Sequence, residues 1–369
     1  MGKKTLLRRV AALVCAATLA FGMVGVLSAC GESSGSSGGN ASSDVSASAT
    51  RIFTDSCGRE VELPATVERV AVSGPVSQQV FLTFAPDLLV GLATEIDDKT
   101  AKYVGVQYAD LPVYGQIYGG KGDLNKEAVA SADPQVIVDI GEAKSTVSED
   151  MDALQEQLGV PCVHIEATLS TYDEAYTMLG ELTGLQDKGA EMATYCRTAY
   201  DTTVAGLDKV TDKVSGLYVV GVDGLSVIAK DSYQAQVVDM VIDNLAVLES
   251  PSAKGTGNEV SMEQIALWAP DFIVFGESTY DTMGDLAEWA DIPAIANNNY
   301  IDTPLAPYNW LSNPPSVNQL LGLQWFARTL YPEQFTDSVQ DVVTSYYKLF
   351  YNYDMSESEY AEFIQNSTL

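Results

Sequence analysis

Two stretches of this chain, LNKEAVASADPQVIV (124–138) and VSMEQIALWAPDFIV (260–274), align in register. They share a glutamate (Glu127 and Glu263), an alanine, a proline and a closing Ile-Val. Each predicts a short helix behind a polar N-cap, a proline stop and a buried strand. Helix-proline-strand is common in α/β proteins, so coincidence is the alternative. The glutamate at the same helical offset favours a βα unit that the chain uses twice.

Short runs of β-branched and apolar residues alternate with amphipathic segments along the rest of the chain. Such alternation predicts parallel sheets covered by helices, that is, an α/β fold. A unit used twice implies two lobes of similar build. Residues 185–210 contain no proline and predict a helix of more than twenty residues. At 1.5 Å per residue this helix would be roughly 30 Å long, enough to cross from one lobe to the other.

Residues 1–30 form a separate segment. Four basic residues precede an apolar run, which ends in the sequence LSAC at Cys30. This order is typical of an export signal. The alternative is an uncleaved anchor helix, but small residues interrupt the apolar run. LSAC resembles the lipobox of bacterial lipoproteins, in which the cysteine is lipidated and becomes the new N-terminus, so Cys30 is the predicted lipidation site.

The segment after the leader, residues 31–50, is mostly Gly, Ser, Ala and Asn. It cannot bury a core, and we expect a flexible tether. The remaining residues exceed a single typical domain and fit two. We therefore expect an N-terminal lobe at 51–184, the connecting helix at 185–210 and a C-terminal lobe at 211–369.

The chain is strongly acidic, with a formal net charge of −30. Without the leader, 16 Lys and Arg face 50 Asp and Glu. Such a surface repels the phosphate backbone, which disfavours nucleic-acid binding. The simplest interpretation of the charge is solubility at an envelope surface.

Cysteine and histidine usage restricts the chemistry. Beyond Cys30 the chain has Cys57, Cys162 and Cys196 without a CxxC pair, so we expect no thiolate metal cluster and at most one internal disulfide. The only histidine, His164, lies in VPCVHIEA, which predicts a strand that buries the ring. Metal sites that need several histidines are excluded, and a Ser-His-Asp triad would have to use His164.

The opening TDSCGREVELPATVERVAV (54–72), the lipobox, the tether, the two glutamate-bearing helices and the long helix together resemble the substrate-binding proteins of ABC importers for iron chelates and cobalamin. The resemblance spans about residues 51–353. It implies two Rossmann-like α/β lobes joined by one long rigid helix, with the ligand in the cleft between them. It also implies a receptor and not an enzyme: a monomer without a resident cofactor, lipid-anchored outside the cytoplasm, whose partners are a permease, its ATPase and a small-molecule ligand.

In that family one glutamate of each lobe docks onto arginines of the permease, and the matching positions are Glu127 and Glu263. Each lies in the first turn of its predicted helix, where the helix dipole keeps a carboxylate ionised and exposed. The alternative is that both glutamates only favour their helix N-termini.

Loops that follow strands are the candidates for ligand binding, because the crevice of an open α/β sheet lies at the carboxyl ends of its strands. The main candidates are residues 73–79, 114–122, 140–146, 222–234 and 252–259. Two of them contain a Gly-Lys turn, with Lys121 and Lys254, just ahead of a predicted helix. Glycines let backbone N–H groups form an anion nest and lysine adds a positive charge, so we expect both lysines at the ligand. The alternative is two ordinary surface turns.

The loop APYNWLSNPPSV (306–317) presents Tyr308, Asn309 and Trp310 among three prolines. Prolines stiffen the loop, so its aromatic faces are presented at low ordering cost. Such faces suit a flat ligand, for example a catecholate chelate, a corrin ring or a porphyrin. The tyrosines expected to extend this wall are Tyr114, Tyr118 and Tyr280. The alternative is that Trp310 fills the core of its lobe.

The arginines of the chain after the leader are Arg51, Arg59, Arg69, Arg197 and Arg328. None lies in the candidate loops, so no arginine would be available to pair with the negative groups of a highly charged siderophore. Such a ligand is therefore disfavoured. The predicted ligand is therefore an iron chelate or a corrinoid- or haem-like molecule, and a metal oxyanion such as molybdate or tungstate is the alternative. A chelatase-like enzyme would need cluster cysteines or a basic histidine in a spacing that the chain lacks. A surface adhesin without a small ligand is compatible with the repeat.

Overall fold

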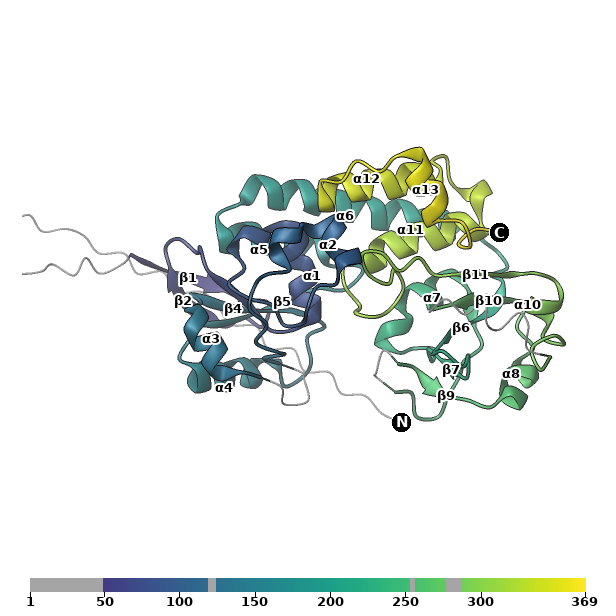
Figure 1. Ribbon diagram of the computed structural model, residues 1–369, viewed down its shortest axis with the longest axis horizontal. Helices are drawn as coiled ribbons and strands as arrows, with labels where there is room; N and C mark the ends of the chain where they lie inside the picture. The colour runs from purple at the N-terminus through teal and green to yellow at the C-terminus, as the bar shows by residue number, and fades with distance from the viewer. Residues whose placement is uncertain (1–48, 119–123, 253–255, 277–286) are drawn as a thin grey trace, which may run out of the picture. The chain divides into compact units, whose positions relative to one another are not determined.

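The computed structural model describes residues 49–118, 124–252, 256–276 and 287–369, and two sheets form its framework (Figure 1). The first sheet has the strand order β3-β4-β5, all parallel. The second has the order β11-β10-β6-β7-β9, with β8 also paired to β6. Its strands β6, β10 and β11 are parallel, and β7 runs antiparallel to its neighbours. The predicted mixed α/β fold with parallel sheets is confirmed.

The strands are short, and several coincide with the apolar runs of the sequence. The first sheet consists of β3 (Val70–Val72), β4 (Val136–Gly141) and β5 (Cys162–Glu166). The second consists of β6 (Ser215–Val220), β7 (Ser226–Val227), β8 (Asp243–Asn244), β9 (Asn258–Glu259), β10 (Phe272–Phe275) and β11 (Tyr300–Asp302). A separate antiparallel hairpin is formed by β1 (Thr50–Thr54) and β2 (Glu60–Pro64).

Helices connect the strands of each sheet. Those before residue 185 are α1 (Pro75–Phe84), α2 (Asp98–Val104), α3 (Lys126–Ala132), α4 (Val147–Leu158) and α5 (Tyr172–Thr183). The later ones are α7 (Gln236–Val241), α8 (Met262–Trp268), α10 (Pro293–Ala296), α11 (Asn318–Leu330), α12 (Val339–Tyr351) and α13 (Glu357–Phe363). Single 3-10 turns are η1 (Pro86–Leu88), η2 (Val106–Tyr108), η3 (Tyr233–Ala235) and η4 (Pro332–Gln334).

The long helix predicted at 185–210 is α6 (Gln186–Leu207), with 22 residues. It packs against α5 and α11. Its close approach to α5 depends on Gly189, where a Cβ atom would lie 2.6 Å from the carbonyl oxygen of Tyr176 and 3.0 Å from the Cα of Gly180. In the part of the chain that the structure describes, no helix has the length and apolar character needed to cross a membrane.

The two copies of the repeat fold alike. α3 and α8 each have seven residues, and the N-cap side chains of Asn125 and Ser261 accept a hydrogen bond from the backbone N–H three residues on, at 3.0 and 3.3 Å. Both helices end in a residue with left-handed backbone, Asp133 (φ 49°) and Ala269 (φ 45°). A proline follows in each copy and prevents the helix from continuing. Each copy then enters a central strand, β4 or β10.

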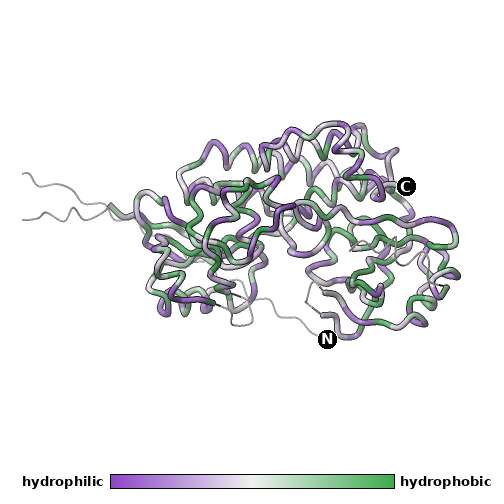
Figure 2. The backbone as a smooth tube through the Cα atoms, in the orientation of Figure 1, coloured by the Kyte–Doolittle hydropathy of each residue, from purple (hydrophilic) through white to green (hydrophobic). Residues whose placement is uncertain are grey.

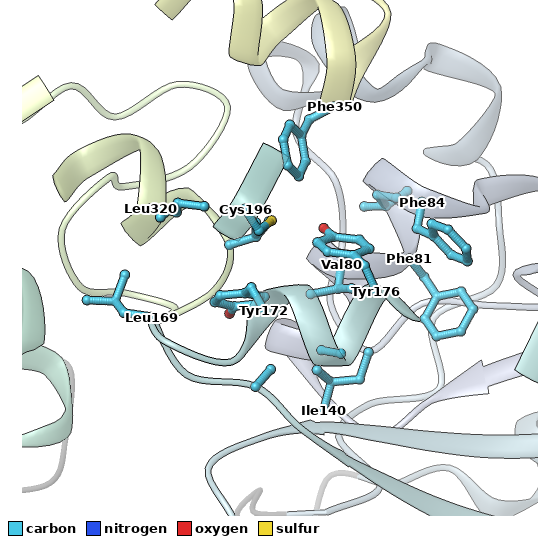
Figure 3. Close-up of a cluster of buried hydrophobic side chains, with 14 of the residues drawn as sticks. Val80, Phe81, Phe84, Ile140, Leu169, Tyr172, Tyr176, Cys196, Leu320 and Phe350 are labelled. Carbon is cyan, nitrogen blue, oxygen red and sulfur yellow. The ribbon is translucent and has the colours of Figure 1, made fainter. Parts of the chain in front are cut away.

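The larger core is continuous from the first sheet to one face of the second. Figure 3 shows its middle, where Tyr172 and Tyr176 of α5 lie among side chains of α1, α6, α11 and α12. The centroid of the Tyr176 ring lies 5.8 Å from that of Phe84 and 5.9 Å from that of Phe350. In Figure 2 the central strands β4, β6 and β10 run mainly in the hydrophobic colour, as expected for strands covered on both faces.

Alternate side chains of β6 point into two different hydrophobic cores, one on each face of the second sheet. Tyr218 and Val220 face the larger core, whereas Leu217 and Val219 belong to a smaller cluster on the opposite face. Successive side chains of a strand point to opposite faces, so one strand contributes to both. The smaller cluster is closed by Trp289, which is fully buried.

The opening hairpin is fixed by a buried carboxylate. Asp55 accepts hydrogen bonds from the backbone N–H of Cys57 (2.9 Å) and of Arg59 (3.0 Å), and from the Arg59 guanidinium (2.8 Å). Arg59 also contacts Asp152 of α4 at 2.8 Å. Arg59 also donates to the carbonyl oxygen of Cys162 on β5 at 3.0 Å, so the TDSCGR segment ties the hairpin to the first sheet.

Candidate functional site

A pocket of about 310 Å³ lies where β3 and β4 end. Its lining residues come from four segments: Ser73, Gly74, Pro75, Val76 and Ser77; Gln116 and Tyr118; Asp139, Ile140, Gly141, Glu142 and Lys144; Tyr233 and Gln234. Apart from Asp139, they all lie in the predicted loops 73–79, 114–122, 140–146 and 222–234. Because η3 follows β7 of the second sheet, the pocket is lined by segments from both sheets.

The side chain of Asp139 is held at the pocket by hydrogen bonds on both oxygens. Oδ1 accepts from the Ser73 hydroxyl, and Oδ2 lies 2.7 Å from Nδ1 of His164. The Ser73 hydroxyl lies 3.0 Å from that of Ser77, which accepts from the backbone N–H of Ile140 at 2.8 Å. Asp139 is only 8% exposed. One oriented carboxylate is therefore built into the pocket.

Helix α1 begins at the same pocket. Its N-cap, Gly74, provides no side-chain cap, and Pro75 occupies the first turn. The first N–H groups of a helix have no intrahelical partner, which here concerns Val76 and Ser77. The helix dipole adds positive partial charge at this end, so hydrogen-bond acceptors of a ligand are favoured here.

Two tyrosines and one lysine stand at the rim. The Tyr118 hydroxyl donates to Asp150 of α4 at 2.7 Å, and Nζ of Lys144 lies 5.2 Å from the centroid of the Tyr118 ring. The Tyr233 hydroxyl lies 3.3 Å from the carbonyl oxygen of Ala167. Burial raises the pKa of Tyr118, with a further contribution from the hydrogen bond to Asp150, and burial also raises the pKa of Tyr233. Both side chains thus stay neutral and offer an aromatic face with a polar end.

The expectation that Tyr114 contacts the ligand is wrong. Its side chain is 1% exposed, and its hydroxyl accepts a hydrogen bond from the backbone N–H of Val72 at 2.8 Å and lies 3.2 Å from the carbonyl oxygen of Gly91. The tyrosine therefore joins β3 to the following segment inside the core. Tyr118, by contrast, does line the pocket.

Trp310 also lies in the core, as the alternative interpretation had it. Its side chain is 0% exposed, and Nε1 donates to the carbonyl oxygen of Ala306 at 3.1 Å. The ring packs on Trp325 of α11 and Phe363 of α13, with centroids 5.9 and 5.4 Å apart. A Cβ atom at Gly322 would lie 2.0 Å from the Trp310 carbonyl oxygen, so the loop presses directly on α11. Such a side chain cannot form the wall of an open cleft.

Tyr308 and Asn309 are half-buried and do not line the pocket. Asn309 Oδ1 accepts from the backbone N–H groups of Leu311 (2.8 Å) and Ser312 (3.0 Å), and its amide donates to the Tyr218 hydroxyl at 3.1 Å. The Tyr308 hydroxyl has no hydrogen-bond partner among the described residues, and burial raises its pKa. The Thr100 hydroxyl donates to the Pro307 carbonyl oxygen at 3.0 Å, so the loop 306–317 packs between the halves of the chain.

Four predicted site residues lie outside the described residues: Lys121, Lys254, Tyr280 and Cys30. The two Gly-Lys turns are thus represented only by their flanking segments.

Glu127 and Glu263 are both exposed and occupy the second position of α3 and α8. Hydrogen bonds from its own backbone N–H and from Ser261 lower the pKa of Glu263. The repeat therefore presents a carboxylate at the start of an equivalent helix in each half of the chain.

His164 is a buried residue of β5, as predicted, with 0% exposure. Within the described ranges no three His, Cys, Asp or Glu side chains are grouped so as to hold a metal ion. Cys57, Cys162 and Cys196 are free thiols, and burial raises the pKa of Cys162 to about 12. The described region therefore offers neither a reactive thiolate nor a metal centre.

Reasoning from the sequence identified the loops of the pocket but missed most of its residues. Asp139 was overlooked because it lies inside the apolar strand VIVDIG, where a single acidic residue was the available signal. Ser73, Tyr233 and Gln234 are common residue types, and nothing in their local sequence distinguishes them from surface positions. Only the meeting of segments from two sheets reveals them.

Comparisons with known proteins agree with this architecture. The sequence profile of periplasmic binding proteins matches residues 86–306. Molybdate-binding protein MolA of Haemophilus influenzae is 23% identical over 340 residues, which cover 83% of this chain and 92% of that protein. The solved structure of MolA bound to molybdate has a TM-score of 0.65 at 20% identity, with 83% of this chain and 99% of that chain covered.

Two further structures are similar in fold. An ABC transporter solute binding protein from Sulfurospirillum deleyianum has a TM-score of 0.78 at 23% identity and covers 85% of this chain and 99% of its own. A periplasmic solute binding protein from Veillonella parvula has a TM-score of 0.67 at 21% identity and covers 86% and 98%. The chain therefore belongs to the periplasmic binding protein family, of the iron-chelate and cobalamin type: it is an extracytoplasmic solute-binding protein of an ABC transporter and not an enzyme.

Proposed function

We propose that this protein captures a metal chelate in the pocket at the ends of β3 and β4 and delivers it to its permease. The position of the pocket carries the proposal. It adjoins the carboxyl ends of two parallel strands, the usual ligand site of open α/β sheets, and residues of η3 line it as well. Tyr118 and Tyr233 supply aromatic faces, and Gln116 and Gln234 supply amides that donate and accept hydrogen bonds.

A metal chelate without a flat macrocycle suits this pocket better than a corrinoid or haem. The volume of about 310 Å³ lies within the roughly 300–1,000 Å³ usual for small-molecule sites. With Trp310 in the core, the loop 306–317 does not provide the flat aromatic wall that a corrin or porphyrin ring would use. Lys144 is the only cationic side chain among the described lining residues, which disfavours a ligand with many negative charges.

A metal oxyanion is the second candidate. The similarity to MolA favours it, and so do the N–H groups at the start of α1. Lys121 and Lys254 would add positive charge if their Gly-Lys turns reach the ligand. Asp139 opposes it, because a carboxylate at the pocket repels an anion.

We also propose that the chain forms two Rossmann-like lobes, at 51–184 and 211–369, with α6 as their rigid connection. α6 packs against α5, which precedes it, and against α11, which lies far beyond it in the chain. A helix held by neighbours from both halves resists bending. We therefore expect the lobes to keep nearly the same angle with and without ligand.

We also propose that the protein is anchored to the membrane beside its permease. Lipidation of Cys30 would anchor the mature chain, and residues 31–50 would tether the receptor beside its permease. There Glu127 and Glu263 would dock onto arginines of the permease. Exposure of both carboxylates at equivalent helix positions supports this role.

Ligand-induced stabilisation is the direct test. The mature protein is expected to melt at a higher temperature with at least one chelate from a panel of ferric siderophores, haem and cobalamin. A ligand at a hundred times its Kd stabilises the folded state by about 2.7 kcal/mol. Differential scanning calorimetry measures the shift. Stabilisation by molybdate or tungstate alone would instead favour the oxyanion receptor.

Obstruction of the pocket is expected to weaken binding. A Cβ atom at Gly74 would have only the carbonyl oxygen of Tyr118 within 4 Å, at 3.7 Å, so a larger side chain has open space before it. Gly74→Leu should raise the Kd at least ~10-fold, equivalent to about 1.4 kcal/mol, without lowering the melting temperature of the free protein. Gly74→Ala is the matched control, with affinity near wild type. An unchanged Kd for Gly74→Leu would mean that the ligand binds elsewhere.

A further inference from the structure

We propose that Asp139 makes the pocket selective for ligands that carry no net negative charge and present a hydrogen-bond donor or a positive charge to this carboxylate. The inference rests on the proposed function, because it concerns the ligand of the same pocket. It defines the cargo as an uncharged or cationic metal chelate, such as one in which hydroxamate groups surround the metal. It disfavours anionic chelates and oxyanions.

Ser73 and His164 orient Asp139 through hydrogen bonds on both of its carboxylate oxygens. His164 Nδ1 lies 2.7 Å from Asp139 Oδ2, whereas His164 Nε2 is buried and has no hydrogen-bond partner among the described residues. A protonated ring would bury a second N–H donor without an acceptor, which is costly. His164 is therefore a neutral ring that donates from Nδ1. It orients the carboxylate, as the Ser73 hydroxyl does, without neutralising it.

The described residues around Asp139 do not supply a compensating charge. The charged residues among the described lining are Asp139, Glu142 and Lys144, two carboxylates against one ammonium. Glu142 and Lys144 are exposed, so water screens them, whereas Asp139 is 8% exposed. An anion would thus approach an oriented carboxylate in a partly desolvated site, where like charges repel more strongly than in water.

The pocket also combines hydrogen-bond donors on one side with an acceptor on the other. The start of α1, with the N–H groups of Val76 and Ser77, favours acceptor oxygens, and Asp139 favours donors or cations. A ligand that satisfies both carries acceptors and donors on the same face. Neutral chelates with carbonyl-type oxygens and N–H or ammonium groups meet this requirement, and a bare oxyanion offers acceptors only.

Asp139→Asn is the decisive variant. Asparagine has nearly the same shape, and its amide can still accept from His164 and contact Ser73, so the fold is retained. The mature protein and the variant are titrated calorimetrically with four probes: ferrioxamine B (a cationic hydroxamate chelate), ferrichrome (neutral), ferric enterobactin (an anionic catecholate chelate) and molybdate. Wild type is expected to prefer the better of the first two over both anions at least 10-fold. In Asp139→Asn this preference should fall at least 10-fold.

A charge-matched control accompanies the variant. Asp110→Asn removes an exposed carboxylate that does not line the pocket. It is expected to change the preference no more than twofold. A control that matches Asp139→Asn would show that total charge, and not the Asp139 position, sets the preference, and the inference would be overturned.

The outcomes separate this inference from the proposed function. If wild type binds an anionic probe more tightly than both hydroxamates, or if Asp139→Asn leaves the ranking unchanged, the charge selectivity is wrong while the receptor function stands. If wild type binds none of the four probes and haem, cobalamin and tungstate also fail to stabilise it, the metal-ligand receptor is wrong and the inference falls with it.

Discussion

A double variant with Glu127→Lys and Glu263→Lys is expected to lose import while it retains its affinity for the ligand. Both glutamates are exposed and neither lines the pocket, so the reversal leaves the ligand contacts intact. If the two carboxylates meet arginines of the permease, each change replaces an attractive pair with two facing cations. Juxtaposed like charges cost several kcal/mol at an interface, so two such changes should lower uptake by roughly 100-fold or more.

Uptake of labelled ligand by a deletion strain that carries the variant measures this effect, and calorimetry measures the affinity of the purified protein. The matched control is Glu181→Lys with Glu191→Lys, two exposed glutamates on α5 and α6 that change the net charge by the same amount. This control should import normally. Loss of ligand affinity in the docking variant, or import equal to that of the control, would contradict the docking role.

Trp310→Ala is expected to lower the free energy of unfolding by about 3–5 kcal/mol, the usual cost of deleting a large aromatic side chain from a core. The indole is fully buried against Trp325 and Phe363, and its Nε1 is bonded to the Ala306 carbonyl oxygen. Removing it leaves a cavity between the loop and α11, and the Ala306 carbonyl oxygen keeps only the hydrogen bond from the Tyr347 hydroxyl. Urea denaturation monitored by far-UV circular dichroism measures the loss.

The affinity of Trp310→Ala for the ligand should stay within about threefold of wild type at a temperature where the variant is folded, because Trp310 does not line the pocket. Trp268→Ala provides the control: this tryptophan of α8 is only half-buried, so a smaller loss of stability is expected. If Trp310→Ala kept its stability but lost its affinity for the ligand, Trp310 would contact the ligand, and its role in the core would be contradicted.

Much of the fold was predictable because it depends on local patterns. The two aligned stretches become α3-β4 and α8-β10, since an N-cap, a short amphipathic helix and a proline stop act within a few residues of one another. The absence of proline from 185–210 is likewise a local property, and α6 occupies most of that range. The long-range family pattern then led to the correct family.

The aromatic loop shows where such reasoning failed. Prolines and exposed-looking asparagines suggested a rigid rim, yet Trp310 turns inward and Asn309 folds back on its own loop. Whether an aromatic side chain faces solvent or a neighbouring helix depends on what packs above it. Here that neighbour is α11, whose Gly322 admits the loop backbone, and no feature within 306–317 reports its presence.

Local patterns in the chain were sufficient to predict the α/β class, the repeated unit, the long helix and the segments from which the pocket is built, because periodicity, capping and strand-end loops are encoded over short distances. Which residues share the pocket depends on tertiary packing. Asp139 becomes an oriented carboxylate only because β5 brings His164 beside β4 and the start of α1 brings Ser77 beside Ser73. Some of these contacts join residues that are tens of positions apart in the chain. Which side chains meet in this way depends on tertiary packing and not on the neighbouring residues in the sequence.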